Sequence, residues 1–364
     1  MELKNKKFYL YGAGIFGKAL CRYLLSIGIE PRAFIDISPS AEKYLAIPIL
    51  KFHDNEFEFG YPVLLCILGY GDVGSSVKQR GFFNVVDTYD VFDMYPEALS
   101  ELTTCGFVWM QEPRAEQFDD EKISELLTLL GDTASKSTLS QIINFRKMPC
   151  RNFYPEPEKY EMYFPLSIDG LYAGDNLKIL DIGAFDGDTL NEYAKRWPEK
   201  IAKYLAIEVS PRHIDLIFKR GITLPNSEVE IVQGAVGLPT DAKLAIKENS
   251  SATQVRVVYD KNIESNETIV PSIQLKPLLA DHDFNLIKMD IEGADYSALL
   301  QMSDFINART PTLILSVYHT PDDIWRIPLF INRIAPDKYH LYLRQEGHWG
   351  LETILYAIPR DVTI

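Results

Sequence analysis

The chain has 364 residues, a length that predicts two to three domains if each holds about 150 residues. Hydrophobic residues make up 46% and charged residues 24%, values typical of folded globular proteins, which excludes a disordered or collagen-like chain. The net charge of −14 and the lack of a Lys/Arg stripe argue against nucleic acid and anionic membranes as partners, because both attract basic surfaces.

The cysteines predict a reducing compartment. They lie far apart and form no C-x-x-C motif, which excludes the usual zinc frameworks and a disulfide scaffold. The sequence also has no run of about 18 apolar residues that could span a membrane. We therefore expect buried, reduced thiols and a cytoplasmic location. The cysteines are Cys21, Cys66, Cys105 and Cys150.

The first predicted elements are a strand over residues 7–11, a glycine turn and an apolar helix that runs to residue 25. Gly12, Gly14 and Gly17 have the spacing G-x-G-x-x-G, which allows a tight turn and close approach of the backbone to a pyrophosphate. This order predicts a Rossmann-like domain over residues 1–100.

A nucleotide is the natural candidate ligand of that domain. A second predicted strand, 33–36, ends at Asp36, where an acid can accept hydrogen bonds from ribose hydroxyls. Gly12, Gly14, Gly17 and Asp36 are therefore candidate residues for an NAD-type nucleotide or a nucleotide sugar. The same glycines also pack a helix on a strand without any ligand, and no tyrosine has the Tyr-x-x-x-Lys spacing of short-chain dehydrogenases. We expect an accessory module and leave its ligand open.

Residues 101–165 have a different pattern. Apolar residues recur at helical spacing in 119–131, and a second helix is expected over 134–147. Prolines then exclude regular helix from 149 to 165. We predict a helical hairpin and a linker that join two domains.

A second series of strands and helices follows, over residues 166–364. Parallel strands alternating with helices predict a second doubly wound sheet. The last two strands alternate in polarity around a Gly-containing turn, which predicts an antiparallel hairpin. The expected strands are 177–182, 204–208, 228–232, 286–289 and 313–317, and the hairpin is formed by 338–344 and 353–358.

The first turn of this domain has the spacing D-x-G-x-x-x-G, with Asp181, Gly183 and Gly187. Glu208, at the end of the next strand, can accept hydrogen bonds from both hydroxyls of a ribose. S-adenosylmethionine and NAD both offer such a ribose, but the C-terminal antiparallel hairpin favours the methyl donor.

The segments that carry a family resemblance are, in order, LDIGAFDGDT, AIEVSP, VQGAVG, IKMDIEGAD, LSVYH and LYLRQEGHWGLETILYA. From about residue 160 to 360, the sequence resembles the FkbM-type methyltransferases. The resemblance implies a class I methyltransferase fold, S-adenosylmethionine as cofactor and O-methylation of sugars or polyketide-like molecules. It also implies that the cofactor is lined by Asp181, Gly183, Ala184, Gly187 and Glu208. Asp295 stands where the family more usually has Glu.

Three polar residues follow the fourth and fifth strands of this domain, at the edge where doubly wound sheets bind ligands. His319 is the best candidate base by type, because its ordinary pKa lies near neutral pH. Asp290 or Glu292 could orient the imidazole or accept the proton directly. A magnesium site of Asp290 with Asp322 or Asp323 is a rival, but such acids commonly interact with a helix dipole, and we expect no metal.

We therefore predict an S-adenosylmethionine-dependent O-methyltransferase. Its substrate would be a hydroxyl of a sugar, glycan or polyketide-like metabolite. The alternatives are an NAD(P)- or nucleotide-sugar-dependent oxidoreductase or epimerase that uses the first domain, and a non-catalytic nucleotide-binding module. Self-association into a homo-oligomer stays open.

Overall fold

The computed structural model of the chain describes residues 3–53, 56–67, 73–105, 118–239, 243–249, 252–258 and 268–361. Backbone contacts group the chain into two compact units. Unit 1 holds Met1–Phe118, Thr138–Pro157 and Gly347–Leu351, and unit 2 holds Asp119–Ser137, Glu158–Glu346 and Glu352–Ile364. The helices expected to bridge two domains are thus divided between the units.

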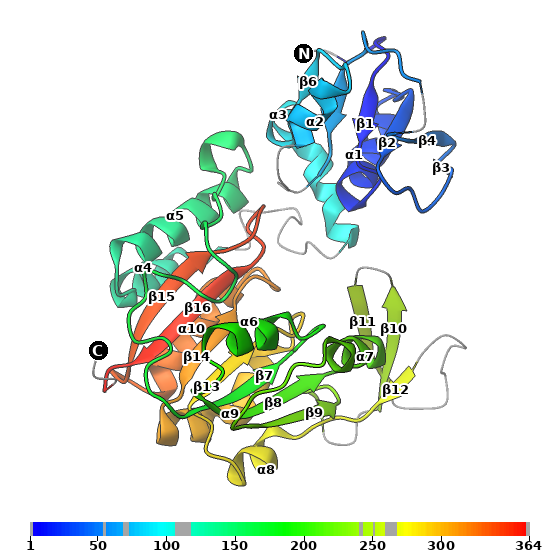
Figure 1. The fold of residues 1–364 in the computed structure, drawn as a ribbon. Coiled ribbons are helices and arrows are strands. Elements are labelled where there is room, and N and C mark those ends of the chain that lie inside the picture. The colour runs from blue at the N-terminus through cyan, green and yellow to red at the C-terminus, as the bar shows by residue number, and fades with distance from the viewer. Residues whose placement is uncertain are drawn as a thin grey trace. The chain divides into compact units, whose positions relative to one another are not determined.

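Unit 1 is built on a six-stranded sheet in the order β3-β4-β2-β1-β5-β6, in which only β3 runs antiparallel to its neighbour (Figure 1). The strands are β1 (Tyr9–Tyr11), β2 (Ala33–Asp36), β3 (Lys43–Tyr44), β4 (Ile47–Lys51), β5 (Val63–Leu65) and β6 (Val85–Val86). The helices are α1 (Ile15–Ser26), α2 (Val73–Gln79), α3 (Thr88–Met94) and two 3₁₀ helices, Pro96–Cys105 and Arg151–Phe153; α5 (Thr133–Lys147) begins in unit 2 and ends in unit 1. This parallel-rich sheet agrees with the predicted Rossmann-like fold.

Close packing explains two of the three glycines in the first motif. A Cβ atom on Gly17 would lie 1.9 Å from the carbonyl oxygen of Gly12. Gly12 has φ +102°, and a Cβ there would lie 2.9 Å from the carbonyl oxygen of Cys66. Gly14 has open space around its Cα. The turn between β1 and α1 therefore requires Gly12 and Gly17 whether or not a ligand binds.

The core of unit 1 contains an aromatic cluster centred on Trp349, which is 2% exposed. The rings of Phe16, Phe92 and Phe145 lie 5.3, 5.2 and 5.9 Å from it. The Tyr154 hydroxyl accepts a hydrogen bond from the Trp349 backbone N–H at 3.1 Å. A residue near the C-terminus thus completes the core of the N-terminal unit.

Unit 2 contains a seven-stranded sheet in the order β15-β16-β14-β13-β7-β8-β9 (Figure 1). β7, β8, β9, β13 and β14 are parallel, and β16 runs antiparallel to both β14 and β15. The predicted doubly wound sheet with a C-terminal antiparallel hairpin is therefore confirmed. Its strands are β7 (Leu177–Ile182), β8 (Ile201–Glu208), β9 (Glu228–Gln233), β13 (Leu286–Met289), β14 (Thr312–Ser316), β15 (Tyr339–Gln345) and β16 (Thr353–Pro359).

Most helices of unit 2 follow strands of this sheet in the chain, as a doubly wound fold requires, but the first one precedes all seven strands. The helices are α4 (Asp120–Leu129), α6 (Asp188–Arg196), α7 (Pro211–Arg220), α8 (Leu275–Ala280), α9 (Asp295–Arg309) and α10 (Asp323–Ile334). A small antiparallel sheet, in the order β11-β10-β12, lies between β9 and α8 in the chain and was not expected. Its strands are β10 (Lys243–Asn249), β11 (Ala252–Val258) and β12 (Thr268–Val270).

No helix in the described part of the chain is long and apolar enough to cross a membrane. Three of the four cysteines are described as free thiols: Cys21, Cys66 and Cys150. Cys105 lies at the end of a 3₁₀ helix, and its side chain is outside the description. The cytoplasmic location stays a prediction.

We expect Gly17→Ala to destabilise unit 1 by about 1–3 kcal/mol, because the added Cβ overlaps the Gly12 carbonyl and the turn must shift. Gly60→Ala is the matched control, since a Cβ at Gly60 meets nothing within 4 Å. Calorimetric unfolding of the two variants measures the difference. Equal melting temperatures would contradict the packing role of Gly17.

Candidate functional site

At two positions of the loop between β7 and α6, the backbone has a conformation that only glycine adopts easily. Gly183 has φ +84° and Gly187 has φ +82°. A Cβ on Gly183 would lie 1.9 Å from the carbonyl oxygen of Asp290, the residue that follows β13. Gly183 is therefore needed for contact with the neighbouring strand end, a reason different from the approach to a ligand that the sequence suggested. Ala184 is 1% exposed beside it.

Glu208 ends β8 and organises this loop. Its side chain accepts hydrogen bonds from the backbone N–H groups of Phe185 and Ser210, both at 2.9 Å. His213 Nδ1 lies 3.3 Å from Oε1. Oε1 faces both Ser210 and His213, whereas Oε2 accepts the Phe185 N–H and can accept a further hydrogen bond, so Glu208 remains suited to a ribose hydroxyl.

The hydrogen bonds of the loop N–H groups indicate which kind of ligand the site suits. Gly183 N and Ala184 N donate to the carbonyl of Ile207, and Gly187 N donates to that of Ala184. Phe185 N donates to Glu208. These four donors are occupied by the protein, so they do not form the N–H cradle that phosphate requires. A ligand that has a ribose and no phosphate, such as S-adenosylmethionine, fits this donor set.

Asp181, expected to line the cofactor, lies in the core of unit 2 and is 0% exposed. Its Oδ1 lies 3.1 Å from Lys288 Nζ, and its Oδ2 accepts a hydrogen bond from the Tyr204 hydroxyl. Lys288 in turn donates to the carbonyl of Gly183 at 2.6 Å. The Asp181 carboxylate thus binds a side chain that holds the loop.

Two of the three predicted catalytic residues meet at the carboxyl ends of β13 and β14. The His319 side chain is 4% exposed, and its Nε2 lies 3.1 Å from Asp290 Oδ1. On the other side of the ring, Nδ1 lies 2.8 Å from Oδ2 of Asp295. Asp295 is fully buried and also accepts hydrogen bonds from the N–H groups of Ile291 and Gly293. A carboxylate therefore faces each nitrogen of the imidazole.

This geometry determines the charge of His319. Burial lowers the pKa of His319, but the charge of Asp295 and the contacts with Asp290 and Asp295 raise it well above its usual value. Burial raises the pKa of Asp290, but contact with His319, and then Lys288 and Tyr163, bring it below its usual range. At neutral pH the pair is imidazolium and carboxylate. An imidazolium has no free lone pair with which to accept a proton, and the role of His319 as a base stays a prediction.

Tyr163 also contacts Asp290. Its hydroxyl donates to Asp290 Oδ2 at 2.7 Å. Its backbone has φ +68°, and its N–H donates to Glu346 Oε2 at 2.7 Å. The Tyr172 hydroxyl donates to the Tyr163 carbonyl at 2.5 Å. These bonds hold Tyr163 in a left-handed conformation that is rare for a non-glycine residue. No spacing in the sequence indicates this contact, because 127 residues separate the partners.

Glu292 points to solvent, unlike the other two predicted catalytic residues. Its side chain is 80% exposed, and its Oε2 lies 3.9 Å from His319 Nε2. A role in contacting the substrate fits this position better than a role in orienting the imidazole.

The acids proposed as partners of Asp290 in a magnesium site have other partners. Asp323 Oδ1 and Asp322 Oδ2 pair with Arg326, at 2.7 and 3.2 Å. Asp323, the first residue of α10, also accepts a hydrogen bond from the N–H of Thr320. Over the described ranges, no three His, Cys, Asp or Glu side chains are grouped as metal ligands.

Another carboxyl group, that of Glu352, lies near the same strand ends. Burial, followed by the charge of Asp290, raises the pKa of Glu352 to about 8, and Tyr318 hydrogen-bonds to it. Tyr318 directly precedes His319, and their rings are 4.3 Å apart. The raised pKa of Glu352 thus lies near neutral pH, and no motif in the sequence indicated this residue.

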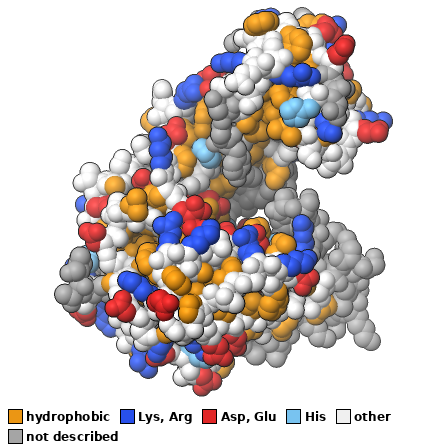
Figure 2. Space-filling view, in the orientation of Figure 1, with side chains coloured by type: hydrophobic (Ala, Val, Ile, Leu, Met, Phe, Trp, Pro, Cys, Tyr) orange, Lys and Arg blue, Asp and Glu red, His pale blue; other side chains and the backbone are white. Residues whose placement is uncertain are grey.

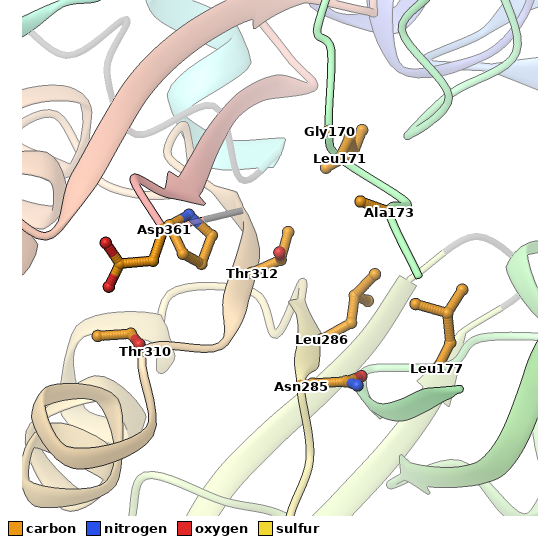
Figure 3. A pocket seen from close by; sticks show the side chains of 10 residues that line it. Gly170, Leu171, Ala173, Leu177, Asn285, Leu286, Thr310, Thr312 and Asp361 are labelled. Atoms are coloured by element: carbon orange, nitrogen blue, oxygen red, sulfur yellow. The ribbon is translucent and has the colours of Figure 1, made fainter. Parts of the chain in front are cut away.

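A cavity of about 280 Å³ opens at the opposite edge of the sheet (Figure 3). It lies at the amino ends of β7, β13 and β14 and is lined by Leu177, Leu286 and Thr312 among others. None of the predicted site residues lines it. The candidate site is therefore the polar cluster at the carboxyl ends, where doubly wound sheets bind ligands.

In unit 1, Asp36 accepts hydrogen bonds from the N–H groups of Ala13 and Ser38, at 2.8 and 2.9 Å. Gly14 is the N-cap of α1 and supplies no side-chain hydrogen bond. The acid thus stabilises the turn itself, and its contact with a nucleotide stays a prediction.

Comparison with known proteins supports the second unit as the catalytic one. Residues 181–347 match the family model described as "Methyltransferase FkbM domain". No curated protein matches the sequence. Methyltransferase FkbM from Methylobacillus flagellatus KT is similar in fold, with 19% identity, a TM-score of 0.64, and coverage of 97% of this chain and 90% of that one. The resemblance drawn from the motifs is confirmed.

Two further solved methyltransferase-fold structures are similar over about half of this chain. Precorrin-6y C5,15-methyltransferase from Geobacter metallireducens GS-15 has 15% identity and a TM-score of 0.31, and the match covers 52% of this chain and 82% of that one. Aeropyrum pernix fibrillarin in complex with S-adenosyl-L-methionine has 9% identity and a TM-score of 0.31, with coverage of 53% and 70%.

We expect His319→Gln to destabilise unit 2 most between about pH 5 and 6.5. The raised pKa of His319 means that its contribution is complete below its unfolded pKa and is lost as pH rises through the folded pKa. The lowered pKa of Asp290 means that its contribution is complete above its own unfolded pKa. Urea unfolding of wild type and variant at pH 6 and pH 10 measures the difference.

His340→Gln is the matched control for this comparison, because burial lowers the pKa of His340 and its contribution has the opposite pH dependence. A His319→Gln effect that grows toward pH 10 would contradict the imidazolium assignment.

Proposed function

We propose that this chain, an S-adenosylmethionine-dependent methyltransferase whose residues 181–347 form an FkbM methyltransferase domain, methylates a hydroxyl group of a sugar, glycan or polyketide-like metabolite. One observation carries the proposal. The loop suited to the cofactor and the ionised Asp290 carboxylate lie side by side, because Gly183 packs directly against the Asp290 backbone carbonyl.

Glu208 and the 183–187 loop would hold the cofactor, with the Glu208 carboxylate on the ribose hydroxyls. When bound, S-adenosylmethionine supplies an activated methyl group that an oxygen nucleophile can attack in line. The protein's contribution is to align the acceptor oxygen and to receive its proton.

Asp290 would accept the hydroxyl hydrogen of the substrate and so direct an oxygen lone pair toward the methyl group. His319 and Tyr163 hold the two carboxylate oxygens, at 3.1 and 2.7 Å. The low pKa of Asp290 makes it a weak base. A weak base is enough for this step, because an alcohol oxygen becomes strongly acidic as it gains the methyl carbon and loses its proton late.

The acceptor would be a small molecule or a glycan rather than a nucleic acid. Carboxylates outnumber cations around the acceptor position, where Asp290, Glu292 and Glu352 are near His319. Carboxylates bind polyhydroxyl groups well and repel phosphate-rich polymers. On the face shown in Figure 2, basic side chains are interspersed with acidic ones.

We expect Glu208→Gln to weaken the binding of S-adenosylhomocysteine by about tenfold or more, because one carboxylate oxygen is replaced by an amide donor. Isothermal titration calorimetry measures the dissociation constant. Glu228→Gln is the matched control, since Glu228 is exposed on β9. Equal affinity of the Glu208 variant and the control would remove Glu208 from the cofactor site.

We expect Asp290→Asn to lower kcat about 100-fold or more, while the affinity for S-adenosylhomocysteine changes less than about threefold. The acceptor is first found by incubating radiolabelled S-adenosylmethionine with monosaccharides, nucleotide sugars, glycans and simple amines. Asp283→Asn, at an exposed acid paired with Lys178, is the control. Labelling of amines alone would contradict O-methylation, and full turnover by Asp290→Asn would remove Asp290 as proton acceptor.

A further inference from the structure

Lys288 is a buried charged residue that the proposed mechanism does not yet use. It is the third residue of β13, and its side chain is 3% exposed. The register of β13 with β7 places it directly opposite Asp181. A lysine so buried requires partners for its charge and its three N–H donors.

The ammonium group has three partners, all in unit 2. Nζ donates to the carbonyl oxygen of Gly183 at 2.6 Å and lies 3.1 Å from Asp181 Oδ1. It also lies 5.1 Å from the ring centre of Tyr163. Burial lowers the pKa of Lys288, but the charges of Asp181 and Asp290 raise it above its usual value, so the group is an ammonium at neutral pH.

The bond to Gly183 restrains the part of the loop that contacts the catalytic strand end. The Gly183 N–H donates to Ile207 at 2.8 Å, and its Cα packs against the Asp290 carbonyl. With Lys288 on its carbonyl, Gly183 is bound to β8 through its N–H and to β13 through its carbonyl. Since Phe185, two residues on, donates to Glu208 at 2.9 Å, a shift of Gly183 would displace the carboxylate that faces the ribose.

We propose that Lys288 is a positioning residue for S-adenosylmethionine, which fixes the 183–187 loop through the Gly183 carbonyl, and that Asp181 acts through Lys288 without touching the ligand. This inference rests on the proposed function, since it concerns the same cofactor loop. It gives the D-x-G-x-x-x-G motif a different interpretation: its acid orients a lysine on β13, the neighbouring strand in the sheet, and that lysine holds the first glycine.

The experiment asks whether Lys288 positions the 183–187 loop or only neutralises the buried charge of Asp181. Lys288→Met alone would leave Asp181 buried without a counter-charge and could prevent folding. The informative protein is therefore the double variant Asp181→Asn, Lys288→Met, which removes both charges and keeps an acceptor for Tyr204. Its fold is checked by thermal unfolding, and its dissociation constant for S-adenosylhomocysteine is measured by calorimetry.

We expect the double variant to fold and to bind S-adenosylhomocysteine about tenfold or more weakly than wild type, the effect of losing one hydrogen bond from a charged donor. Asp181→Asn alone leaves Asp290 as the nearby negative charge for Lys288, so its fold is also checked by thermal unfolding. The folded variant keeps the Lys288 bond to Gly183, and its affinity should lie within about threefold of wild type. The control is the double variant Lys178→Met, Asp283→Asn, which removes the exposed ion pair of 2.5 Å that starts on β7.

Wild-type affinity in the folded Asp181→Asn, Lys288→Met variant would overturn the proposal, because the pair would then only fill the core. A loss of affinity in Asp181→Asn as large as in the double variant would overturn the assigned division of roles. If wild type binds no S-adenosylhomocysteine, the proposed function fails first, and this inference fails with it. Failure of the O-methylation assay alone leaves the binding measurement as a separate test.

Discussion

The close approach of Gly183 to the Asp290 carbonyl is the constraint on which the site of unit 2 depends. Two loops that follow different strands meet there without a side chain between them, because a Cβ would lie 1.9 Å from the oxygen. The contact places the loop proposed to hold the cofactor and the acid proposed to face the acceptor at one point of the sheet edge. Geometry of this kind is what methyl transfer requires, since the rate depends on alignment of the donor and the nucleophile.

Buried charges surround this contact in a definite order. Asp181 and Lys288 lie beneath the loop, and Asp290, His319 and Asp295 lie beyond it. Removing one member of such a group leaves an uncompensated charge in a region of low dielectric, which is strongly destabilising. The site is therefore rigid for an electrostatic reason as well as a steric one. Protein groups that are already fixed around the reacting atoms need to move little during catalysis.

Much of the fold follows from local sequence patterns. The strands over 33–36, 177–182 and 286–289 have the predicted bounds, because each is a short, mostly apolar run that ends at or just before an acid or a glycine. The roles of the site residues were harder to predict from the sequence. His319 was assigned as a base from its ordinary pKa, but Asp295, 24 residues away, sets its charge.

Two other assignments depended on partners that the sequence does not reveal. Asp181 was placed on the ligand by resemblance, but strand register gives it Lys288 as a neighbour. Tyr163 contacts Asp290 from a connector whose prolines indicate only an irregular backbone. The core of unit 1 also contains Trp349, which lies in the 347–351 segment. During synthesis, the other segments of unit 1 therefore leave the ribosome before Trp349, and the core of unit 1 is complete only after residue 349 has been made.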